Sequence, residues 1–268
     1  MNEILSLSND IFERYGAIKR ARGCFLYTEK SIRLTDMYRE GGRAILGWGG
    51  SSAFTMLKNA LNRGSTGSFC TREVYQLDKA ASALIDNRLS GKPSRKVFVC
   101  HCASDVPFAK GAKTYTPFSP ERVDYSTEDV VIIEPPLPLS AFSSVTLIAV
   151  KAEKSDCIGE DFASVFLSAP MAAGVARSLF DLIKEEREWQ EKDFFIYDSV
   201  LTKYWTRKGC YLFPKVKRED YKEFVRHCLD CEIVISPLYD VPSIVPFGAD
   251  KGVFSKLKNT PFVSGASN

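Results

Sequence analysis

The chain has 268 residues, enough for one large domain or two modest ones, and either arrangement can bury a substantial core. Its 36 basic and 33 acidic residues leave a net charge of +3, too weak a field to favour nucleic acid or an anionic membrane as a partner. The most apolar runs are far shorter than a bilayer-spanning helix. Partners therefore have to be inferred from individual sites.

The cysteines indicate a reducing compartment. They are spread along a long chain with no cysteine-dense loop framework, which favours free thiols over disulfides. The N-terminal segment has neither a basic start nor an apolar stretch of signal-peptide length, so we expect a cytoplasmic protein. The eight cysteines are Cys24, Cys70, Cys100, Cys102, Cys157, Cys210, Cys228 and Cys231.

Hydrophobic periodicity predicts elements in the first third of the chain. A short amphipathic helix fits residues 2–15 because apolar side chains recur there at helical spacing. Gly47 to Gly50 form a flexible corner, and Gly64 is suited to end the helix that follows it. The other expected elements are strands at 25–27, 32–34 and 44–46 and helices over 54–61 and 72–88.

Continuous apolar runs then predict buried strands, and the helical period returns after them. A proline-rich turn from Pro135 to Pro138 ends one of these strands. Ser168 and Pro170 introduce the longest helix of the chain. In chain order, the expected elements are strands at 96–100, 129–134 and 145–150, a helix over 169–188, a strand at 211–213, a helix over 218–229 and a strand at 233–235.

The two ends of the chain together resemble the small domain of a class III, fold type I pyridoxal-phosphate aminotransferase. The segment from 23 to 64 carries turn and glycine landmarks similar to those of the family, and the segment from 208 to 237 is similar to the family's later strand, helix, strand unit. The matching landmarks are Leu34, Asp36, Gly42, Leu46, Gly47 and Gly49.

The resemblance implies an α/β fold. We expect a reduced fold type I aminotransferase-like sheet with covering helices, plus an α+β small domain built from both chain ends. The expected boundaries are 1–71 for the N-terminal part of the small domain, 72–192 for the reduced large domain and 193–268 for the C-terminal part of the small domain. Because enzymes of this fold are dimers, it also implies a homodimer.

The resemblance also indicates where the cofactor would bind. The loop after the strand at 96–100 stands where the family holds the cofactor phosphate, which makes Ser104 a candidate ligand. The helix start at Gly50, Ser51 and Ser52 is a second candidate, because backbone N–H groups and hydroxyls suit an anion. Lys151 ends a strand, the position expected of a Schiff-base lysine, where a desolvated amine is activated.

Other parts of the family's chemistry are missing. The phosphate loop has no glycine, Asp105 would repel a phosphate, and Pro107 interrupts the next helix. The strand that carries the aspartate for the pyridine nitrogen is not found in residues 137–163. Our main hypothesis is therefore a catalytically degenerate, homodimeric binding or structural protein with no cofactor expected and its small-molecule ligand unassigned. The alternative is an active transferase with pyridoxal phosphate on Lys151.

A third hypothesis is a metal-binding protein. Cysteine and histidine are soft zinc ligands, and two groups of them occur, 100–102 and 227–231. However, cysteines on the apolar stripe of a helix are ordinary core residues, so no metal site is expected. Arg177, in the longest expected helix, is suited either to bind a carboxylate or to lie along the protein surface. The chain has neither a nucleotide-binding P-loop nor a Gly-x-Ser-x-Gly elbow.

Overall fold

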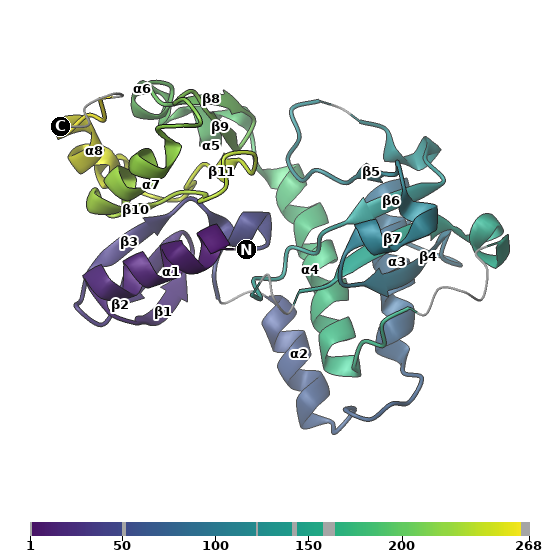
Figure 1. Cartoon of the computed structure of the whole chain (residues 1–268). Helices are drawn as coiled ribbons and strands as arrows, with labels where there is room; N and C mark the ends of the chain where they lie inside the picture. Colours follow the sequence, from purple (N-terminus) through teal and green to yellow (C-terminus); the bar gives the residue numbers. More distant parts are fainter. Residues whose placement is uncertain (1, 50–51, 122, 141–143, 158–163, 264–268) are drawn as a thin grey trace. The chain divides into compact units, whose positions relative to one another are not determined.

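The structure, a computed structural model, describes residues 2–49, 52–121, 123–140, 144–157 and 164–263. The chain folds into two units, one formed by residues 1–49 and 189–268 and the other by residues 50–188 (Figure 1). Within the described ranges, no helix combines the length and apolar character needed to cross a membrane.

The first unit joins the two ends of the chain in one sheet. Its strand order is β1-β2-β3-β10, with β10 parallel to β3 and the other pairs antiparallel. Residues Thr35 and Ile233, far apart in sequence, are register partners there. The elements are α1 (Asn2–Tyr15), β1 (Ile18–Arg22), β2 (Phe25–Thr28), β3 (Arg33–Asp36) and β10 (Ile233–Val234).

A second, antiparallel sheet of order β11-β9-β8 and several helices complete this unit. Trp205 and Phe224 are fully buried in its core. The elements are α5 (Glu191–Phe195), α6 (Asp198–Leu201), β8 (Trp205–Lys208), β9 (Tyr211–Pro214), α7 (Tyr221–Asp230), β11 (Ser243–Ile244) and α8 (Ser255–Asn259).

The turn after β3 is held by a buried carboxylate. Asp36 accepts backbone N–H bonds from Tyr38 and Arg39, both at 3.0 Å, and a 2.6 Å bond from Trp48 Nε1. Gly47 has φ +94°, and a Cβ there would lie 3.3 Å from the Cα of Gly23. The strand expected at residues 44–46 is a series of turns instead, because Ala44 and Ile45 are buried by packing and not by pairing in a sheet.

The second unit is a four-stranded sheet covered by helices. Its order is β4-β7-β6-β5, with β7 antiparallel to both neighbours and β5 parallel to β6. The elements are α2 (Ser52–Asn62), α3 (Arg72–Asp86), β4 (Arg95–Cys100), β5 (Lys113–Thr114), β6 (Val130–Ile133), β7 (Thr146–Lys151) and α4 (Ala169–Glu188). Short 3-10 segments lie at Ala103–Asp105, Pro107–Ala109, Tyr125–Thr127 and Ala152–Cys157 in this unit, and at Arg39–Gly42 and Lys251–Phe254 in the first unit.

Helix α2 belongs to this second unit. Ala53 of α2 is buried in the same core as Leu77 of α3 and Leu179 of α4. At Gly174 of α4, a Cβ would lie in ordinary van der Waals contact with the side chain of Leu57 on α2, at 3.4 Å. The unit boundaries therefore fall after residues 49 and 188, where the sequence analysis placed them after 71 and 192.

Candidate functional site

The central sheet of the second unit separates the candidate residues into two groups. Because β4 and β7 are antiparallel, Arg95 is the register partner of Lys151, whereas Cys100 is the partner of Thr146. These two residue pairs mark opposite ends of the paired strands, five residues apart along each strand, or about 17 Å at ~3.4 Å per residue. Lys151 therefore lies where β7 ends, and the loop with Ser104 follows β4 at the opposite end of the paired strands. Each set of strand ends forms one edge of the sheet.

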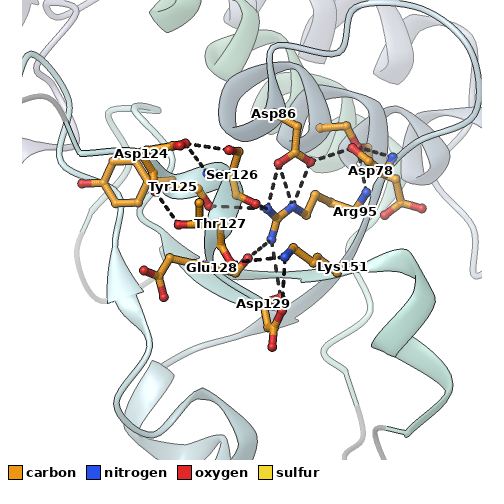
Figure 2. A network of polar contacts seen from close by, with 12 residues as sticks. Asp78, Asp86, Arg95, Asp124, Tyr125, Ser126, Thr127, Glu128, Asp129 and Lys151 are labelled. Carbon is orange, nitrogen blue, oxygen red and sulfur yellow. Dashed lines mark hydrogen bonds and ion pairs between the residues drawn. The ribbon is translucent and has the colours of Figure 1, made fainter.

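At its edge, Lys151 is already engaged by protein groups. Its Nζ lies 3.2 Å from Oδ1 of Asp129 and donates to the carbonyl oxygen of Thr127, also at 3.2 Å (Figure 2). Lys154 pairs with the same carboxylate, and the hydrogen bonds from the two lysines hold the pKa of Asp129 below its usual value. The amine of Lys151 takes part in an ion-pair cluster and is not a free nucleophile.

A buried arginine organises the same edge. The side chain of Arg95 is 0% exposed, and its guanidinium binds Asp86 through Nε at 2.9 Å and Nη2 at 2.7 Å. Its Nη1 donates to the carbonyl oxygen of Glu128 at 2.6 Å and Nη2 to that of Ser126 at 3.2 Å (Figure 2). Arg95 thus ties the segment before β6 to the end of α3, which is a structural role.

The opposite edge has an acidic character. Ser104 is exposed, donates to Asp105 at 3.1 Å and lies 3.0 Å from the thiol of Cys102. Burial raises the pKa of the Cys100 thiol to about 11, and the charges of Cys102, Glu134 and Asp105 add to this rise. The negative charges that disfavour a thiolate also disfavour a phosphate, because both are anions.

The start of α2 contains the other candidate phosphate ligands. Gly50 and Ser51 lie outside the described residues. The hydroxyl of Ser52 lies 2.6 Å from both carboxylate oxygens of Asp181, to which it donates, and accepts a 2.7 Å bond from Nε of Arg177. Ser52 is therefore satisfied by protein groups and faces a carboxylate.

The two cysteine and histidine groups lie in different units, residues 100–102 in the second and 227–231 in the first. His227 lies 2.8 Å from the carbonyl oxygen of Thr260 and 3.9 Å from the thiol of Cys231. Burial raises the pKa of Cys228 well above its usual value. Across the part of the chain that the structure describes, no three His, Cys, Asp or Glu residues are grouped so as to hold a metal ion.

Two charged residues were not predicted from the sequence, the buried Arg95 and the half-buried Asp78. Asp78 lies on α3 and accepts a 2.8 Å bond from the backbone N–H of Val97, and burial raises its pKa to about 6. A charged residue within an otherwise apolar helix stripe or strand is the signal that would have marked them, because such residues need a partner when buried.

No family model matches the chain. An uncharacterised protein of Treponema pallidum (strain Nichols) is 28% identical over 286 aligned positions, which cover 88% of this chain and 91% of that protein.

Among solved structures, the ornithine delta-aminotransferase of Plasmodium falciparum matches with a TM-score of 0.66 at 9% identity, covering 96% of both chains. The acetylornithine aminotransferase of Elizabethkingia anophelis matches with a TM-score of 0.65 at 10% identity, covering 94% of this chain and 96% of its own. At these identities the likeness concerns the fold and spans nearly the whole chain. The protein therefore has the fold of the class III, fold type I aminotransferases.

Proposed function

We propose that this protein is a catalytically degenerate member of the aminotransferase fold that acts as a homodimeric binding or structural protein. The observation that carries the proposal is the separation of Lys151 from Ser104 across the sheet. Pyridoxal-phosphate chemistry needs one site that holds the phosphate, an anion beside the pyridine nitrogen and a lysine within bonding reach. The described residues do not assemble that set.

The fit of pyridoxal phosphate fails at each of the three candidate residues that the structure describes. Lys151 has its amine in an ion pair with Asp129, and its side chain is only 27% exposed. Ser104 lies next to Asp105, and Ser52 donates to Asp181, so both hydroxyls face carboxylates where a phosphate needs donors. We therefore assign no reaction step to the cofactor.

The test is reductive trapping. Purified protein is incubated with pyridoxal phosphate, reduced with borohydride and digested, and the modified lysines are mapped by mass spectrometry. We expect weak labelling spread over exposed lysines, with Lys154 labelled at least as much as Lys151, because its side chain is 52% exposed and it shares the same carboxylate. Near-complete labelling of Lys151 alone, lost in Lys151→Ala but kept in Lys154→Ala, would instead show a specific Schiff base on Lys151 and favour the active transferase.

The homodimer is tested separately. Static light scattering at micromolar concentration should give twice the 30.0 kDa chain mass. A monomer mass would remove the dimer from the proposal without altering the argument about the cofactor.

A further inference from the structure

A cleft of about 540 Å³ opens among helices α2, α3 and α4 of the second unit. Its volume lies within the range of roughly 300–1,000 Å³ that is typical of small-molecule sites. Its apolar wall consists of Met56 on α2 and of Ala173, Ala176 and Phe180 on α4. This wall suits a small hydrocarbon or aromatic body.

The rest of the cleft carries an excess of positive charge. Three arginines line it, and two of them are balanced: Arg63 pairs with Glu73 at 2.5 Å, and Arg177 with Asp181 at 2.9 Å. Arg72 has no ion pair or hydrogen bond from its side chain to any described residue. Among the residues that the structure describes, one positive charge is therefore left uncompensated in the cleft.

The position of Arg72 strengthens the demand for an anion. It is the first residue of α3, a helix of 15 residues, so the positive end of the helix dipole adds to its own charge. Arg63 uses only Nη2, and Arg177 only Nε, in bonds to described residues. Their remaining N–H groups have no partner among the described residues, and both side chains line the cleft with Arg72.

We propose that this cleft binds a small organic acid with one carboxylate on an apolar body. A carboxylate matches the planar fork of a guanidinium and neutralises the single surplus charge. A phosphate monoester, with about −1.5 to −2 charges at neutral pH, would leave excess negative charge beside Glu73. The apolar body packs against Met56 and Phe180.

This inference goes beyond the proposed function and does not depend on it. Neither Lys151 nor Ser104 lines the cleft, so an organic acid binds there whether or not the protein holds pyridoxal phosphate. The two sites can fail or succeed independently in experiment.

The test is isothermal titration of the full chain with octanoate, with octanamide and with inorganic phosphate. Octanamide has the same apolar body without the charge, and phosphate has the charge without the body. We expect octanoate to bind at one site per chain, and tighter than octanamide by about tenfold or more, because hydrogen bonds to charged groups are the strong ones. Phosphate should bind more weakly than octanoate.

The matched variants are Arg72→Gln and Lys58→Gln. Both side chains are exposed and neither has a partner among the described residues, but only Arg72 lines the cleft. Arg72→Gln should weaken octanoate binding about tenfold with an unchanged melting temperature, whereas Lys58→Gln should leave binding as it is. Arg72→Lys, which keeps the charge but not the fork, should fall in between.

Three results would overturn the proposal. They are no octanoate binding at millimolar concentration, equal binding of octanoate and octanamide, and binding that Arg72→Gln leaves unchanged. A dimer that dissociates in Arg72→Gln while octanoate fails to bind would assign the cleft to a second copy of the chain instead.

Discussion

Replacing Arg95 by methionine should destabilise the second unit by about 4 kcal/mol, since removing one partner of a buried ion pair costs about 3–5 kcal/mol. The side chain of Asp86 is only 16% exposed, so its charge would remain with little solvent to stabilise it. The carbonyl oxygens of Ser126 and Glu128 would also lose their donor. At about 3 °C per kcal/mol, the melting temperature should fall by roughly 12 °C.

Circular dichroism with thermal and urea unfolding measures this loss, and amide exchange in α3 and β4 locates it. Tryptophan fluorescence is a contrasting probe, because the three tryptophans, residues 48, 189 and 205, all lie in the first unit. The control is Arg63→Met, whose ion pair has a 50% exposed arginine and should contribute only about 0.2–1 kcal/mol.

A double variant and pH refine the test. Asp86→Leu combined with Arg95→Met should be more stable than Arg95→Met alone, because no unpaired charge is left buried. Burial alone would raise the pKa of Asp86, but hydrogen bonds from Arg95 and Ser94 outweigh it and lower the pKa below 3.8. The stabilisation is therefore present above pH 3.8 and is lost as the pH falls through the lowered value. An Arg95→Met variant within 1 kcal/mol of the parent at neutral pH would refute the reasoning.

Two further substitutions test half-buried positions. Burial raises the pKa of Asp78 from 3.8 to about 6, so the folded state holds this proton more tightly than the unfolded chain and stability declines as the pH rises between those values. Asp78→Asn keeps an acceptor for the backbone N–H of Val97, so it should remove that decline and be more stable than the parent protein at pH 7. The urea midpoints of both proteins at pH 4.5 and 7.5 measure this. An unchanged pH dependence would contradict it. Gly47→Ala should lower the free energy of unfolding by about 1–3 kcal/mol, because the φ of +94° is combined with a close contact between the new Cβ and Gly23. Gly248→Ala, with φ +81° and open space around the Cβ, should lower it less. Equal losses in the two variants would show that the close contact is unimportant.

The elements with a strong period were predictable from the sequence. The helices over 2–15 and 169–188 begin and end where the periodicity placed them, and the ends of β4, β6 and β7 each lie within one residue of their predicted positions. Strand β1 was missed because its sequence, Ile-Lys-Arg-Ala-Arg, has mostly exposed side chains and no alternation to detect. The apolar run at residues 44–46 predicts a strand that does not form, because such a run indicates burial without specifying how the backbone is paired.

The arrangement of the site was not predictable in the same way. That Lys151 ends a strand could be inferred from its local sequence, and the structure agrees. Which edge of the sheet this end occupies depends on the direction of β7 relative to β4, a long-range property that no local pattern encodes. The partners of Lys151 and Ser52 likewise come from segments distant in sequence, Asp129 and Asp181.

The landmarks that carried the family resemblance are residues that shape the backbone. Asp36 accepts three hydrogen bonds inside a buried turn, and Gly47 occupies a left-handed conformation against the backbone of Gly23. These requirements hold for any chain that makes this turn, whatever chemistry follows, because an unsatisfied buried group or a misplaced Cβ costs folding free energy directly. A phosphate ligand or a Schiff-base lysine is under no such constraint, since replacing it leaves the turn intact. Landmarks of the first kind therefore identify the fold, and the activity of such a protein has to be argued from residues of the second kind.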